Sequence, residues 1–240
     1  MTRIFLTAEW RFLTMLNYEI DPAALASAVP PGTELDLWNG RAYCSVVGFL
    51  FLDTRVWGLP VPFHRAFEEV NLRFYVRRRS PEGWRRGVAF VKEIVPRRAI
   101  AALARRLYGE NYVAMPMRHA VDPDPRFGTE GAVEYGWHGR GEWSRLSART
   151  TGAAALAAAG SETEFITEHY WGYAALGAGG SVEYRVEHPS WNIWQVSSAE
   201  LRCDAVALYG PRFAEALGRS PSSAFVADGS RVTVHAGCRI

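Results

Sequence analysis

Polar and apolar residues alternate without a break from Glu69 to Val76. Successive side chains of a β-strand point to opposite faces, so this period of two predicts a strand with one polar and one apolar face. The polar face carries Glu69, Asn71, Arg73 and Tyr75 in order along the strand.

A second predicted strand, residues 88–95, follows a turn at residues 80–83 and is apolar apart from Lys92 and Glu93. In an antiparallel pair across this turn, facing residues have numbers that add up to 163 or 164. Asn71 lies opposite Lys92 in the first register and opposite Glu93 in the second. Both faces of the second strand are equally apolar, so the two registers stay open.

The rest of the pattern predicts many strands and few short helices. An Asn-Gly pair at residues 39–40 predicts a hairpin between strands 34–38 and 41–57. Further strands are predicted at residues 4–18, 111–121, 181–187 and 193–197, with one or two strands over residues 132–149, bent at 139–141. A last hairpin is predicted from 224–226 to 231–235, with its turn at Asp228-Gly229. Helices are predicted at residues 22–28, 97–107, 161–170 and 204–217, and loops at residues 59–64 and 151–160.

This order of elements lacks the regular alternation of strands and helices that βαβ units require, which excludes a Rossmann-type sheet. It predicts an α+β protein that is mainly antiparallel β, a barrel or sandwich with helices on its rim. A chain of 240 residues can bury a substantial core in one large domain or two small ones.

Charge and cysteine content exclude several classes of partner. The 27 basic residues are offset by 25 acidic ones, and a net charge of +2 predicts binding to neither nucleic acid nor membrane. Three scattered cysteines and six histidines without ligand spacing predict no disulfide and no metal site. Without a signal peptide, a membrane span or a nucleotide-binding motif, we expect a cytoplasmic protein with no cofactor.

The polar row has two interpretations. On an open sheet it is the solvent face, whereas inside a closed barrel it lines a ligand pocket that includes Asn71. In such a pocket Arg73 would hold a carboxylate through two hydrogen bonds, while Glu69 and Tyr75 could carry protons.

Lys92 is the only lysine in the chain and lies within an apolar strand. A lysine amine can form a Schiff base with a carbonyl substrate, which makes Lys92 a candidate catalytic residue. A general replacement of lysine by arginine along the chain explains the same observation without any function.

Five segments resemble the YqjF-like family of uncharacterised bacterial proteins. They are FEEVNLRFYV at 67–76, GVAFVKEIVPRR at 87–98, ARRLY at 104–108, FITEHY at 165–170 and VEHPSW at 186–191. That family is grouped with the acetoacetate-decarboxylase-like superfamily. The resemblance therefore implies a single domain over residues 1–240, folded as a cone-shaped antiparallel β-barrel around a pocket, with a few peripheral helices.

Acetoacetate decarboxylase itself carries Arg-Glu-Leu followed by Pro-Lys-Lys, and the first lysine of that second element forms the Schiff base. Residues 92–94, Lys-Glu-Ile, are similar to the first element, and residues 96–98, Pro-Arg-Arg, lie near the second at a shorter spacing. The resemblance thus puts Arg97 in the place of the catalytic lysine. A guanidinium stays protonated and cannot form an imine, so Schiff-base decarboxylation is not expected unless Lys92 supplies the amine.

We therefore expect a pocket that binds a small organic acid or a carbonyl compound. Its candidate catalytic residues are Glu93, Glu69 and Lys92, with Glu93 preferred over Lys92. Its candidate ligand-binding residues are Arg73, Asn71, Tyr75 and Arg97. Enzyme activity and homo-oligomer formation stay open, and the alternatives are a non-catalytic binding or sensing protein and an interaction module whose polar row faces solvent or a partner chain.

Overall fold

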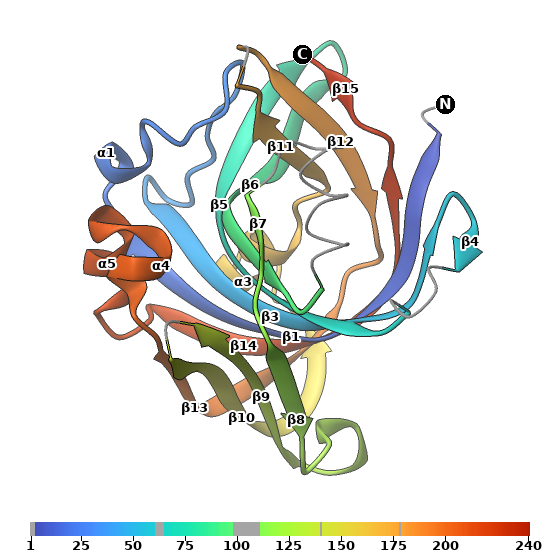
Figure 1. The fold of residues 1–240 in the computed structure, drawn as a ribbon, viewed down its shortest axis with the longest axis vertical. Helices are drawn as coiled ribbons and strands as arrows, with labels where there is room; N and C mark the ends of the chain where they lie inside the picture. The colour runs from blue at the N-terminus through green and yellow to red at the C-terminus, as the bar shows by residue number, and fades with distance from the viewer. Residues whose placement is uncertain (1–2, 61–64, 98–110, 140, 178) are drawn as a thin grey trace.

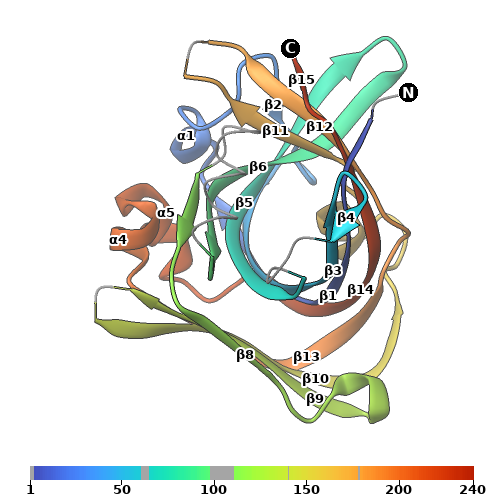
Figure 2. The ribbon, with the colours of Figure 1, turned by 45° about the vertical axis from the view of Figure 1, so that its right-hand side comes forward.

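The computed structural model describes residues 3–60, 65–97, 111–139, 141–177 and 179–240. Its dominant feature is a ring of strands, which can be followed in Figures 1 and 2. In ring order the strands are β12 (Ser181–Glu187), β11 (Trp171–Ala175), β6 (Gly83–Val95), β5 (Phe67–Ser80), β3 (Ala42–Val56), β1 (Ile4–Ile20) and β14 (Ser223–His235).

Two residue pairs join the ends of this path. Val186 of β12 lies opposite Val234 of β14, and Glu187 lies opposite Thr233. Neighbouring ring strands are antiparallel except β11, which runs parallel to β6. The predicted α+β fold with a mainly antiparallel sheet is confirmed.

A second layer of strands packs against the outside of the ring. β14 also pairs with β13 (Asn192–Arg202), and the sheet continues through β10 (Glu142–Leu156), β9 (Glu130–Gly139) and β8 (Met117–Val121). Figure 2 shows these strands as a layer below the ring. The core between the two layers buries Leu16, Leu50 and Val70 of the ring with Tyr135, Trp137 and Leu146 of the outer layer.

The outer layer also holds the ring backbone at a bend in β1. The pairing of β1 with β3 shifts register between Arg11 and Thr14, and Phe12 within this shift has a φ of 54°. The hydroxyl of Tyr135 donates a hydrogen bond of 2.9 Å to the carbonyl of Phe12. A left-handed backbone conformation is costly for a phenylalanine, so the surrounding contacts must hold it in place.

Short elements lie at the edges of the sheet. The α3 helix (Glu162–Thr167) begins at Ser161, whose hydroxyl accepts a hydrogen bond from the amide of Glu164, as its capping sequence predicts. The others are α1 (Pro22–Leu25), α4 (Ala205–Tyr209), α5 (Pro211–Leu217), the 3-10 turn η1 (Pro125–Phe127), β2 (Glu34–Leu35), β4 (Leu59–Pro60), β7 (Tyr112–Ala114) and β15 (Cys238–Arg239).

Two predicted hairpins are corrected. At residues 39–40 the turn forms, but only Trp38 and Arg41 pair across it, and β2 then pairs with β5 instead of β3. The last hairpin is wrong, because β14 runs straight through the expected turn. Gly229 has a φ of 78° and its α-carbon faces the carbonyl of Trp10, so the glycine permits a close approach of β1 and β14.

Other boundaries differ in simpler ways. β10 extends to Leu156 and takes in residues 151–156 of the predicted loop 151–160, because its residues pair with β9 and β13. Pro211 divides the predicted helix 204–217 into α4 and α5, and β11 had not been predicted. The predicted strand 111–121 is two strands, β7 and β8.

Most of the predicted helix 97–107 and of the loop 59–64 lies outside the described residues. Within the described ranges, every helix is too short or too polar to cross a membrane.

Candidate functional site

The ring encloses a cavity of about 160 Å³. Most of its wall is apolar, and its aromatic residues include Trp10, Phe49, Phe51, Phe67, Tyr184 and Trp191. Several of these rings contact one another, as Phe51 and Phe67 do in a stack with centroids 4.6 Å apart. A wall of this kind excludes water and strengthens the electrostatic effect of any charged group placed in it.

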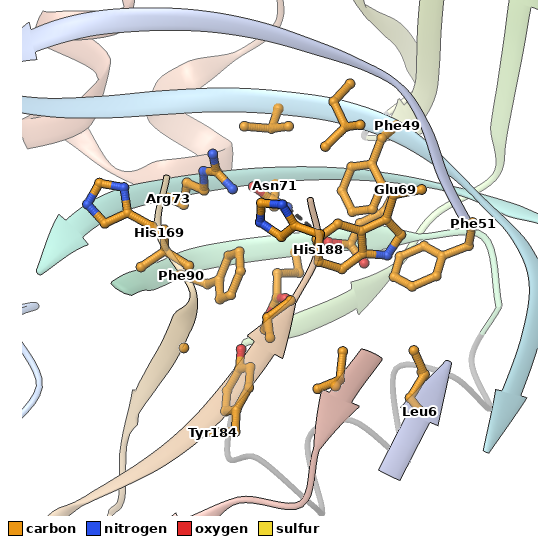
Figure 3. A pocket seen from close by; sticks show the side chains of 18 of the residues that line it. Leu6, Phe49, Phe51, Glu69, Asn71, Arg73, Phe90, His169, Tyr184 and His188 are labelled. Carbon is orange, nitrogen blue, oxygen red and sulfur yellow. Dashed lines mark hydrogen bonds between the residues drawn. The ribbon is translucent and has the colours of Figure 1, made fainter. Parts of the chain in front are cut away.

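The polar row of β5 supplies charged and polar groups to this wall. Glu69, Asn71 and Arg73 all line the cavity, because the period of two puts them on the inner face of the ring (Figure 3). The amide of Asn71 donates to one carboxylate oxygen of Glu69 at 2.9 Å, and the hydroxyl of Tyr112 donates to the other at 3.3 Å. Glu69 and Asn71 are buried.

A β-bulge in β6 decides which charged residue joins this row. From the hairpin turn to Phe90, which faces Arg73, the paired numbers add up to 163; from Lys92, which faces Leu72, they add up to 164. Val91 is the extra residue between the two registers, and a bulge of this kind re-aims the side chains that follow it. Glu93 therefore lies opposite Asn71, lines the cavity and is only 1% exposed.

Lys92 lies on the other face of β6 and does not line the cavity. Its amine donates a hydrogen bond to the carbonyl of Leu208 near the end of α4. This position at the carboxyl end of a short helix gives the single lysine a structural contact outside the ring.

Arg73 is the cationic side chain of β5 that reaches the cavity. One terminal nitrogen donates to the carbonyl of Ile166 at 3.3 Å and contacts the sulfur of Met15 at 3.7 Å. Its Nε is buried and has no hydrogen-bond partner among the described residues. Throughout the described part of the chain, no carboxylate lies within ion-pair distance of Arg73. Other arginines of β5 and β6 do have such a partner, namely Arg77, Arg78, Arg85 and Arg86.

Tyr75 and Arg97 are placed outside the cavity wall. Tyr75 is fully buried behind it, and its hydroxyl lies 2.6 Å from that of Ser45. The Tyr75 ring packs on Phe165 and His169. Arg97 is exposed just after the end of β6.

His169 is a cavity residue that the sequence patterns did not single out. It follows α3, and its Nε2 lies 3.1 Å from a carboxylate oxygen of Asp36, which also accepts a hydrogen bond of 2.6 Å from Nε of Arg86. Burial lowers the pKa of His169 to about 4, although the hydrogen bond to Asp36 acts in the opposite direction. Burial alone would raise the pKa of Asp36, but the hydrogen bonds from His169 and Arg86 hold it below its ordinary value.

His188 also lines the cavity, from the end of β12. Its ring stacks on Trp191 at a centroid distance of 4.0 Å, and its Nδ1 lies 2.9 Å from the carbonyl of Pro189. Burial lowers the pKa of His188, so both cavity histidines favour the neutral form at pH 7.

The resemblance to the YqjF-like family is the sequence feature that could have pointed to these two histidines. His169 lies in the segment 165–170 and His188 in the segment 186–191, and both segments resemble that family. The spacing of the histidines alone gave no such indication. Across the described ranges, no group of three or more His, Cys, Asp or Glu side chains has a geometry that could hold a metal ion.

The sequence matches a known family model over most of its length. Residues 7–231 match DUF2071, an uncharacterized conserved protein. The chain is also 37% identical over 75 residues to the uncharacterized protein YqjF of Bacillus subtilis strain 168, and this match spans 31% of each protein.

Several solved structures have the same fold. The enduracididine biosynthesis enzyme MppR complexed with pyruvate superposes with a TM-score of 0.70 at 14% identity, over 100% of this chain and 91% of that one. Acetoacetate decarboxylase from Legionella pneumophila gives 0.67 at 14% identity, over 99% and 88%. An acetoacetate decarboxylase-like enzyme from Sphingomonas wittichii RW1 gives 0.64 at 17% identity, over 98% and 92%. At these identities the likeness establishes the fold.

Proposed function

The chain belongs to the DUF2071 family of uncharacterised conserved proteins with an acetoacetate-decarboxylase-like fold, and we propose that its cavity binds a small organic acid or carbonyl compound through Arg73. The observation that carries this proposal is that Arg73 lacks a carboxylate partner among the described residues. Its guanidinium reaches an aromatic cavity, and among the described residues it has no carboxylate partner. A partly buried cation without a counter-ion is unfavourable, and a ligand carboxylate would supply one with two matched hydrogen bonds.

The other polar groups of the cavity fit a small acid with a second functional group. Glu69 on β5 and Glu93 on β6 both line the cavity wall, and either could exchange a proton with a ligand held by Arg73. The neighbouring enzyme MppR was solved with pyruvate, so this fold accommodates a small keto acid in that protein.

Calorimetric titration with short acids tests the role of Arg73. We expect acetate, pyruvate or acetoacetate to bind, and Arg73→Gln to weaken binding at least tenfold, because a charge-assisted hydrogen bond contributes about 1.5–3 kcal/mol. Arg79→Gln is the matched control, since Arg79 is an exposed residue near the tip of the β5–β6 hairpin. Equal binding by the Arg73 and Arg79 variants would remove the basis of the proposal.

Binding without turnover is the second candidate function, and the position of Lys92 favours it. The only lysine of the chain points away from the cavity toward Leu208, so it is not placed to form a Schiff base with a bound ligand. Borohydride treatment in the presence of keto acids should therefore leave Lys92 unmodified. A stable adduct on Lys92 would instead support imine chemistry, and product formation followed by NMR would separate an enzyme from a binding protein.

A further inference from the structure

Asp36 and His169 form a buried pair at the end of the cavity where Arg73 lies. The side chain of His169 is 1% exposed, and it reaches the cavity from the segment between α3 and β11. Asp36 sits behind it, just after β2, and is itself fixed by Arg86. The pair is therefore held by three separate parts of the chain.

This arrangement fixes which ring nitrogen of His169 carries the proton. The oxygen of Asp36 that faces Nε2 already accepts a hydrogen bond from Arg86, and a carboxylate has no proton to donate. A lone pair on Nε2 would face this carboxylate oxygen at 3.1 Å, and the 3.5 Å contact from Nη2 of Arg86 is too long to offset that repulsion, so Nε2 is the donor. In the neutral imidazole that burial favours, Nδ1 then holds a lone pair and can only accept.

Nδ1 of His169 is buried, and within the described ranges no donor reaches it. Arg73 lies close by, because Arg73 and His169 both lie against the ring of Tyr75, at 5.6 Å and 4.7 Å from its centre. Figure 3 shows both side chains toward the same end of the cavity, with Glu69 toward the other.

We propose that His169 is a specificity-determining residue that accepts a hydrogen bond from the hydroxyl group of a short hydroxy acid, whose carboxylate is held by Arg73. This inference rests on the proposed function and deepens it, because it names the second group of the ligand. A cation and a neutral acceptor at the same end of the cavity suit a ligand that carries a carboxylate and a hydrogen-bond donor close together. A 2-hydroxy acid has this arrangement, whereas a simple fatty acid or a methyl ether leaves Nδ1 unpaired.

Three acids of similar size test the proposal by calorimetric titration. Lactate carries the hydroxyl, propionate lacks it, and 2-methoxypropionate replaces its proton by a methyl group. We expect lactate to bind roughly tenfold more tightly than the other two, as one hydrogen bond predicts. Equal affinities for lactate and propionate would overturn the role of His169 while leaving the carboxylate site of Arg73 intact.

Variants of His169 and Asp36 separate ligand recognition from folding. His169→Gln places an amide near the Nε2 position, so it can still donate to Asp36 while losing the acceptor, and we expect it to bind lactate and propionate alike. Asp36→Asn keeps an acceptor oxygen and should retain the preference, whereas Asp36→Ala should reduce it. A lactate preference that survives in His169→Gln would refute the inference.

The ligand-free protein provides an independent readout. The nitrogen chemical shifts of His169 should show a protonated Nε2 and a bare Nδ1 at pH 7, and a protonated Nδ1 would refute the inference without any ligand. If none of the three acids binds to the wild-type protein, the proposed function fails, and the ligand class named here fails with it.

Discussion

Asn71 lies directly opposite Glu93 across the β5–β6 pair, although the regular register of the hairpin would place it opposite Lys92. The extra residue, Val91, resets the alternation, so a carboxyl group faces the cavity and the amine faces outward. The acid-base character of the cavity thus depends on one inserted residue.

Replacement of Lys92 by methionine should lower stability and leave ligand binding unchanged. The variant loses the hydrogen bond to Leu208 at the end of α4, which corresponds to about 1–2 kcal/mol in the free energy of unfolding. Urea unfolding measures this loss, and titration with the short acids measures binding. A large change in acid affinity would contradict the outward position of Lys92.

Gly172→Ala should reduce the affinity for acids by closing the cavity. A Cβ atom at Gly172 would lie 2.0 Å from the ring of Tyr184, and both residues line the cavity. The tyrosine ring must move, and overpacking of this kind costs about 1–3 kcal/mol. The comparison of acid affinity and melting temperature with Gly177→Ala provides the control, because nothing lies within 4 Å of a Cβ at Gly177. Equal affinities for the two variants would show that Tyr184 moves away from the cavity.

Glu183→Gln should destabilise the fold far more than the loss of an exposed ion pair. The buried carboxylate accepts hydrogen bonds from Arg85 at 2.6 Å, from the hydroxyl of Tyr173 at 3.0 Å and from Arg78 at 3.2 Å. Both arginines are about a quarter exposed, so we expect a loss of about 2 kcal/mol rather than the larger cost of a fully buried pair.

Glu200→Gln is the matched control for Glu183. Glu200 pairs with Arg145 on the surface, and its side chain is 55% exposed. Its loss should change the free energy of unfolding by less than about 0.5 kcal/mol. Similar values for the two variants would show that burial of Glu183 contributes little.

Stability should fall as the pH is lowered from about 6.5 to about 4. Burial lowers the pKa of His169 to about 4, so between these values the unfolded chain binds a proton that the folded protein does not. The full effect is about 3 kcal/mol for His169. Burial lowers the pKa of His188 as well, so His188 adds to the loss of stability below pH 6.5. The charges of Arg86 and Arg73 also lower the pKa of His169, whereas Asp36 raises it.

Urea unfolding at several pH values measures this dependence. His169→Gln should flatten the slope below pH 6.5, because glutamine does not titrate. A slope that is the same in the variant and the wild-type protein would mean that His169 is already protonated in the folded state.

The polar row of β5 could be predicted from sequence because a strand's period of two depends only on local residue types. The face of Glu93 could not be predicted in this way. The bulge at Val91 is set by how β6 pairs with its neighbours on both sides, and apolar residues flank Lys92 and Glu93 equally. Periodicity identifies faces within a regular strand but not the points at which a strand changes face.

His169 and Asp36 show a second limit. They are 133 positions apart in sequence, and neither lies in a periodic pattern that indicates a contact. The Asp228-Gly229 pair shows a third, since the same two residues that favour a hairpin turn allow β14 to approach Trp10 without turning. In each case a long-range contact determines the outcome, and local propensity does not describe it.

The hydrogen bond from Tyr135 to Phe12 makes the outer layer a support for the cavity. The carbonyl of Phe12 lies in the register shift of β1, between Trp10 and Leu13, whose side chains form part of the cavity wall. Because Tyr135 belongs to β9, a change in this outer strand reaches the cavity wall through one backbone carbonyl. The outer strands thus brace the bend of β1 that positions Trp10 and Leu13 in the cavity wall.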